Sequence, residues 1–245
     1  MSFVFNGVSS DTMKFNVTSR QVYNAPAYDL NAIEVPGRSG DLLNPQNRFK
    51  NKQISYTGFL KASDFEGSTW REKLSTGLIQ LKGWLCSDAG QYHELTDDYD
   101  PGFTRYGYIS GETAISDVQD RPFGVTLTVT FNCKPFMYKA GESIELPETK
   151  SASTENPYPF GSRPLYEITM AGTGTLVVNG REWTITDYTG TLYCDTEAME
   201  WYDASQLRNN IVSGDGWPVF EAGENSVSYT GDITKVMVTP RWRTL

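Results

Sequence analysis

The sequence has few of the residues from which most catalytic and metal sites are built. It contains a single histidine, His93, and three cysteines in 245 residues. Metal clusters that need two histidines are therefore excluded, and a Ser-His-Asp triad would depend on His93 alone. No Gly-x-Ser-x-Gly motif accompanies it. We interpret His93 as a surface or strand residue, and we predict no catalytic residue, no metal ligand and no cofactor.

The cysteines lie far apart and form no Cys-x-x-Cys pair. They are Cys86, Cys133 and Cys194. An odd number at this spacing indicates neither a disulfide framework nor a zinc site. We predict three reduced, buried thiols.

Long apolar segments are also missing. The apolar run Phe3–Phe5 is too short for a signal peptide, and no later stretch is long enough to span a bilayer. We therefore predict a protein that is made and assembled in the cytosol and has no membrane partner.

Basic residues are fewer than acidic ones, 21 against 30, which gives a net charge of −9. The excess is uneven: residues before Ala140 include 14 basic and 15 acidic ones, and the rest include 7 and 15. An acidic C-terminal half does not favour binding to phosphates, so tight nucleic-acid binding is not expected.

One acidic run could suggest a calcium loop. It spans residues 97–102, Asp-Asp-Tyr-Asp-Pro-Gly. The EF-hand spacing fails, because Ile109 stands at the twelfth position of a loop that starts at Asp98. We predict an acidic surface turn.

Alternating apolar and polar residues dominate the sequence. The alternation is longest from Val125 to Cys133 and stops at Pro135, which lacks a backbone donor. A polar stretch follows, so we predict two domains, residues 1–139 and 140–245. Both should be antiparallel β-sandwiches, which makes the fold class mainly β.

One segment has helical spacing instead. Its apolar residues are Trp70, Leu74, Leu78, Leu81 and Leu85. Thr69 and Glu72 form a capping-box pair before it. The spacing predicts one packed α-helix over about residues 69–86.

The second domain contains turn signals between short apolar segments. The clearest is Asn179-Gly180, which lies between residues 176–178 and 183–185 and predicts a type I′ hairpin. A strand is expected at residues 165–170, and a further turn at Thr189-Gly190.

Three sequence features together resemble one protein family. The chain opens with FVFNGVSS, carries VPGRSGDLL from residue 35, and closes its first domain with FNCKPF. Its end, GWPVFEAGENSVSYTGDITKVMVTPRWRTL, resembles the last strands of a galectin-like sandwich. These features resemble the distal tail protein (Dit) family of long-tailed, non-contractile bacteriophages. The resemblance implies a β-sandwich with one helix followed by a galectin-like domain.

The resemblance also implies a function. Such a protein is a tail component, of a phage, a prophage or a tail-derived bacteriocin, at the distal tip of the virion tail. It forms a homohexameric ring, or two stacked rings, and is assembled in the bacterial cytoplasm. Its expected partners are the tail tube, tail-associated and receptor-binding proteins. DNA would pass through the ring without being bound tightly.

Two groups of residues are candidates for the ring interface. One is the PGRSG turn, with Pro36, Gly37 and Arg38. The other is Arg48, Lys50 and Lys52, which alternate along an expected strand. Their side chains would face a phosphate or carboxylate, or simply the solvent at an edge strand.

A carbohydrate-binding module is the alternative function. Trp183, Trp201 and Trp217 could stack on sugar rings, with Tyr188, Tyr193 and Tyr202 beside them, although core packing is the commoner role of such aromatics. A cell-wall hydrolase would need two acids at a fixed separation, and no pair in the sequence stands out.

Overall fold

The computed structural model describes residues 1–21, 24–109, 123–141, 143–146 and 150–245. It is mainly β, with antiparallel sheets and, among the described residues, one α-helix, so the predicted fold class is confirmed. The chain forms two compact units, Met1–Met137 with Leu245, and Tyr138–Thr244. The division falls after Met137, where the sequence suggested a boundary after residue 139.

The first unit contains a sheet in the order β2-β1-β7-β8-β9-β6-β3. Its strands are β1 (Phe3–Phe5), β2 (Val8–Ser9), β3 (Phe15–Gln21), β6 (Lys52–Lys61), β7 (His93–Asp97), β8 (Phe103–Tyr108) and β9 (Gly124–Cys133). Neighbours in this order that are distant in sequence, such as β9 and β6, hold the unit together.

The longest pairing in this sheet joins β6 to β9, from Lys52 opposite Cys133 to Lys61 opposite Gly124. The inward side chains of both strands are buried in the apolar core. On the other face, the hydroxyl groups of Thr57 and Thr128 lie 3.0 Å apart. The strand expected from Val125 to Cys133 is therefore confirmed.

The helix α1 spans Trp70–Cys86. The Thr69 side chain accepts from the backbone N–H of Glu72, and the Glu72 carboxylate accepts in return from the backbone N–H of Thr69, so the predicted capping box is present. A short 3₁₀ helix, η1 (Ala62–Asp64), connects β6 to this region.

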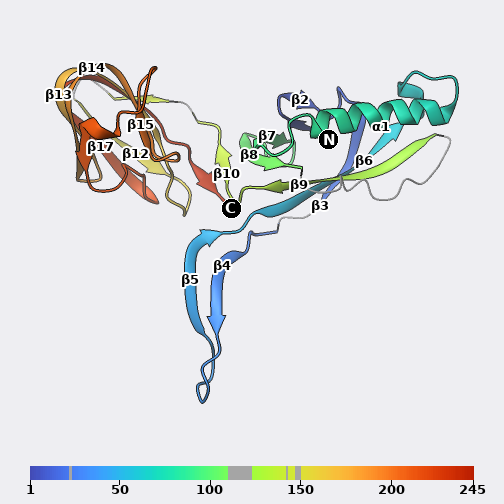
Figure 1. Cartoon of the computed structure of the whole chain (residues 1–245), viewed down its shortest axis with the longest axis horizontal. Coiled ribbons are helices and arrows are strands. Elements are labelled where there is room, and N and C mark those ends of the chain that lie inside the picture. Colours follow the sequence, from blue (N-terminus) through green and yellow to red (C-terminus); the bar gives the residue numbers. More distant parts are fainter. Residues whose placement is uncertain (22–23, 110–122, 142, 147–149) are drawn as a thin grey trace. The chain divides into compact units, whose positions relative to one another are not determined.

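The helix packs on the sheet through its apolar stripe (Figure 1). Trp84 stacks on Phe3 at a centroid distance of 5.7 Å and donates its indole N–H to the carbonyl of Phe5. Because isolated helices of this length are marginal in water, such packing stabilises α1 despite its two glycines.

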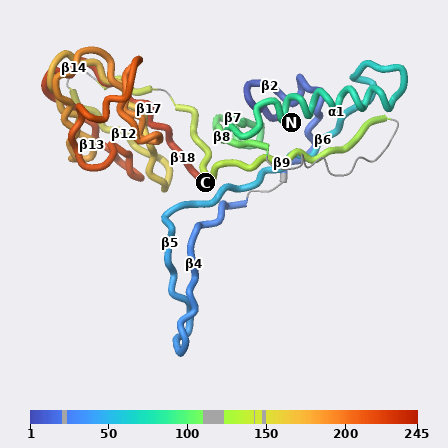
Figure 2. Tube along the Cα trace, viewed as in Figure 1, coloured from blue at the N-terminus to red at the C-terminus, as the bar shows by residue number. Residues whose placement is uncertain are grey.

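Two further strands of the first unit, β4 (Tyr28–Ile33) and β5 (Leu42–Phe49), form a sheet of their own. Figure 2 shows them running side by side to the turn formed by residues 34–41. The PGRSG turn noted in the sequence lies within this connection between β4 and β5.

The main sheet of the second unit has the order β11-β17-β13-β14-β15, with β12 on β17 and β16 on β14. Its strands are β11 (Ile144–Glu145), β12 (Ser151–Asn156), β13 (Leu165–Val178), β14 (Arg181–Asp195), β15 (Glu200–Tyr202), β16 (Val212–Gly214) and β17 (Gly223–Thr239). A 3₁₀ helix, η2 (Asn209–Ile211), precedes β16, and β10 (Met137–Lys139) pairs with β18 (Arg243–Thr244).

The predicted hairpin of the second unit is confirmed, but its strands are longer than expected. Asn179 and Gly180 have φ values of 50° and 77°, as a type I′ turn requires. The strand expected over 165–170 continues to Val178, and a bulge between Gly172 and Gly174 lets it bend. The turn expected at Thr189-Gly190 is wrong, because both residues pair within β14.

The cysteine prediction holds for two residues of three. Cys133 and Cys194 are buried, whereas Cys86, at the last position of α1, is exposed. Burial raises the pKa of the Cys133 thiol to about 12. The Cys86 prediction fails because this residue follows Leu85, the last apolar residue of the helix stripe.

No helix among the described residues is both long and apolar enough to cross a membrane.

The two glycines of α1 provide a matched pair of substitutions. A Cβ at Gly77 would lie 2.7 Å from the Phe65 ring, whereas a Cβ at Gly83 would meet no atom within 4 Å. Gly83→Ala should raise the free energy of unfolding by about 1 kcal/mol through helix propensity. Gly77→Ala should lower it by about 1 kcal/mol, because overpacking exceeds that gain. Urea denaturation of both variants measures the difference; equal stabilisation would contradict this packing.

Candidate functional site

The β4–β5 hairpin carries an unusual number of exposed apolar side chains. Leu30, Ile33 and Val35 are 37–47% exposed, Leu42 is 47% exposed and Leu43 is 61% exposed. Among the described strands, β4 and β5 pair only with each other, from Ile33 opposite Leu42 to Tyr28 opposite Phe49. A two-stranded hairpin with open edges is marginally stable in water, so these features indicate a surface that a partner covers.

The base of the hairpin is held by charged and aromatic contacts. Asp29 accepts from Arg48 Nε at 2.7 Å and lies 3.2 Å from Lys50 Nζ. Hydrogen bonds from these two side chains lower the pKa of Asp29. Phe49 makes edge contacts with Tyr28, at 5.2 Å, and with Phe136, at 5.8 Å. These contacts fix the end of the hairpin next to the main sheet.

The predicted alternation of Arg48, Lys50 and Lys52 on one strand face is wrong. β5 ends at Phe49 and β6 begins at Lys52, so the residues between them interrupt the strand. Arg48 and Lys50 bind Asp29, while Lys52 lines a separate cavity. The other candidates, Pro36, Gly37 and Arg38, all lie in the exposed hairpin turn.

The acidic run at residues 97–102 is only in part the surface turn that we expected. Asp98, Pro101 and Gly102 are exposed in a turn. Asp97 is buried, however, and its carboxylate accepts the Tyr56 hydroxyl at 2.5 Å. Asp100 accepts from Arg20 Nη1 at 2.6 Å and from Arg105 Nη2. Asp97, Asp100, Tyr56, Arg20 and Arg105 form a buried ionic cluster, because strands β3 and β8 bring the two arginines to the turn.

Ionisation within this buried ionic cluster follows from its contacts. Burial tends to raise the pKa of Asp100, but hydrogen bonds from Arg20 and Arg105 outweigh it, and the pKa is lowered. Burial and the Asp97 carboxylate raise the pKa of Tyr56. Asp100 is therefore held as an anion beside two cations, with Tyr56 as a neutral donor.

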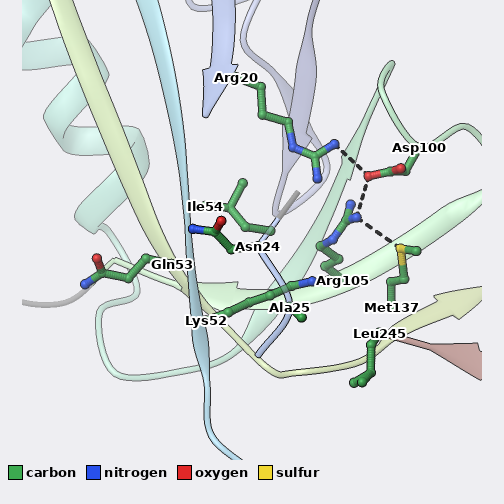
Figure 3. A pocket seen from close by; sticks show the side chains of 10 residues that line it. All are labelled: Arg20, Asn24, Ala25, Lys52, Gln53, Ile54, Asp100, Arg105, Met137 and Leu245. Atoms are coloured by element: carbon green, nitrogen blue, oxygen red, sulfur yellow. Dashed lines mark hydrogen bonds and ion pairs between the residues drawn. The ribbon is translucent and has the colours of Figure 1, made fainter. Parts of the chain in front are cut away.

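A cavity of about 150 Å³ lies next to the buried ionic cluster. Figure 3 shows its lining, which includes Arg20, Lys52, Asp100 and Arg105 with Ile54 and Met137. Three of these side chains are cationic. Charged side chains of the first unit therefore converge on an enclosed space at this cavity.

The tryptophans proposed as a sugar-stacking platform are largely inside the second unit. Trp183 is 2% exposed and Trp201 is 3% exposed, and both belong to its apolar core. Trp217 is half-buried and packs against the same core. The two buried rings cannot stack on a ligand, so that prediction is wrong for Trp183 and Trp201.

His93 takes a packing role in β7. Its ring lies edge-on to Phe5, at a centroid distance of 5.5 Å, and Nε2 lies 3.2 Å from a carboxylate oxygen of Asp88. Within the described part of the chain, no three side chains of histidine, cysteine, aspartate or glutamate form a group suited to a metal ion.

Asp100→Asn should lower the free energy of unfolding at pH 7 by about 3 kcal/mol, because it leaves two buried arginines without a full counter-charge. The folded-state pKa of Asp100 lies below its ordinary value of 3.8, so its charge stabilises the fold above that pH. The difference from the wild type should therefore shrink as the pH falls through the folded-state pKa.

Asp98→Asn is the matched control for this prediction. Asp98 is exposed and, among the residues that the structure describes, accepts hydrogen bonds from Ser2 only, at 2.7 and 3.0 Å. Its substitution should change stability by less than about 1 kcal/mol. Denaturation of the three proteins at several pH values measures both effects. A loss of equal size in the two variants would show that the buried ionic cluster is not stabilising.

Comparison with known proteins identifies the fold. The sequence matches no protein-family model, and no curated protein matches it. The structure is similar to the crystal structure of the Dit protein (gp 19.1) of phage SPP1, with a TM-score of 0.76 and 15% identity over 100% of this chain and 99% of that one. That protein is described as a paradigm of the hub adsorption apparatus in phages that infect Gram-positive bacteria. The chain therefore has a Dit-like fold along its whole length, as the resemblance in sequence predicted.

Proposed function

We propose that this chain is a structural component of a phage tail, which forms a ring at the distal end and serves as the hub for adsorption proteins. The Dit-like fold supports the general role. The single observation that supports ring formation is the β4–β5 hairpin. Its apolar residues are exposed, and among the described strands β4 and β5 pair only with each other.

Ring closure has a geometric requirement that the hairpin would meet in part. A cyclic assembly needs two different complementary surfaces on each copy. The hairpin supplies a narrow, apolar one, and its open strand edges supply backbone donors and acceptors. The next copy would cover Leu30, Ile33, Leu42 and Leu43, so that the hairpin gains the packing that it lacks alone.

The charged residues of the hairpin take a secondary part in this interface. Arg48 is 72% exposed and Lys50 is 57% exposed in their side chains, although both reach Asp29. Together with Pro36, Gly37 and Arg38 in the turn, they would lie at the polar rim of the contact. Lys52 would lie outside it, because this side chain lines the cavity.

The assembly that we propose has six copies per ring, in one or two stacked rings, in the virion at the tail tip. It would form in the cytoplasm of the bacterial host. The tail tube would contact one face, while the more acidic second unit, predicted to be galectin-like, would bind tail-associated and receptor-binding proteins. The acidic charge disfavours tight DNA binding, and weak binding suits a channel through which DNA must pass. We propose no enzymatic role.

Leu43→Glu tests the hairpin as an assembly surface. The substitution should leave the fold intact, since surface changes usually alter stability by about 0.5 kcal/mol or less. It should weaken self-association at least about tenfold, because a carboxylate would be buried without a partner. Light scattering coupled to size exclusion, over a range of protein concentrations, measures the change.

Ile79→Glu is the control for this experiment. Ile79 is 67% exposed on α1, and its substitution adds the same charge away from the hairpin. This variant should associate as the wild type does. If Leu43→Glu also associates as the wild type does, the hairpin is not the contact that builds the ring.

A further inference from the structure

The cavity beside the buried ionic cluster contains polar groups that the protein itself does not satisfy. Arg105 is 2% exposed, and its Nε and Nη1 atoms have no hydrogen-bond partner among the described residues. Its Nη2 donates to Asp100 and to Met137 Sδ. A buried N–H without a hydrogen-bond partner destabilises the fold, so an occupant of the cavity that accepts hydrogen bonds would be stabilising.

Lys52 has no partner of opposite charge among the described residues. Arg20 and Arg105 contact Asp100, but no described carboxylate lies within 4.0 Å of Lys52 Nζ. Figure 3 shows the Lys52 side chain extending from β6 toward Arg105. An anion at this point would supply a charge opposite to that of Lys52.

The electrostatic surroundings of Lys52 also favour an anion nearby. Burial lowers its pKa, and the positive charge of Arg105 lowers it further. Water could fill a cavity of about 150 Å³ and accept from Arg105, whereas an oxyanion would also supply a charge opposite to that of Lys52. The open donors of Arg105, Nε–H and Nη1–H, can each donate a charge-assisted hydrogen bond to an oxyanion oxygen.

We propose that this cavity binds one small oxyanion, a carboxylate or a phosphate, through Arg105 and Lys52. The source of the oxyanion is either an acidic side chain of a second copy of the chain or free phosphate. The cavity itself is formed within a single copy, because all of its lining residues belong to the first unit. Lys52 would thus be an anion ligand, whereas the sequence suggested it only as part of a charged strand face.

Calorimetric titration of the full chain with inorganic phosphate and with acetate tests the site, at constant ionic strength set with chloride. We expect saturable binding of at least one of the two anions. Lys52→Met should weaken it about tenfold or more, the loss expected for a charge-assisted hydrogen bond. Lys52→Arg, which keeps the charge, should retain most of the affinity.

Lys61→Met is the matched control, since Lys61 is exposed at the other end of β6 and does not line the cavity. It should bind like the wild type. The proposal is overturned if neither anion binds more tightly than chloride, or if Lys52→Met and Lys61→Met bind equally. If Lys52→Met does not fold, Lys52→Gln takes its place in the same comparison.

Two further measurements distinguish the sources. If a second copy supplies the carboxylate, Lys52→Met should lower self-association, and added phosphate should lower it in the wild type. If free phosphate is the ligand, self-association should not change. Phosphate should then be released on denaturing the purified wild type, but not the Lys52→Met variant.

Discussion

The pairing of β6 with β9 is the interaction on which the first unit depends. It joins Lys52–Lys61 to Gly124–Cys133, segments that are far apart in the sequence, and its inward residues form much of the core. The strand β8 reaches β9 closely because Gly107 lies opposite Cys133, where a Cβ would be 2.8 Å from the Cys133 sulfur. This approach brings Arg105 to the cavity. The same pairing fixes the start of β6, which places Lys52 beside it and sets the point where the hairpin leaves the sheet.

The first unit therefore contains two different candidate binding surfaces. The hairpin exposes apolar side chains and strand edges, which favour a protein partner. The cavity encloses cations and unsatisfied donors, which favour a small anion. Both lie at the end of β6 where Lys52 begins the strand. The main sheet thus holds both the hairpin and the cavity in place at the same end of β6.

Local patterns in the sequence predicted those elements whose cause is local. The capping box at Thr69 and Glu72, the turn at Asn179-Gly180 and the alternation from Val125 each carry their own signal. The buried ionic cluster carries none, because Arg20 reaches Asp100 across 80 residues. An acidic turn looks the same in sequence whether or not arginines approach it. Likewise, aromatic residues at strand positions do not reveal whether they face a ligand or, as Trp183 and Trp201 do, the core.

The central claim is that copies of this chain close into a ring. Negative-stain electron microscopy of the purified full chain, at concentrations where it associates, tests this most directly. The account predicts closed, six-fold particles with a central hole. Open chains of variable length, irregular aggregates, or single copies at every concentration would contradict it.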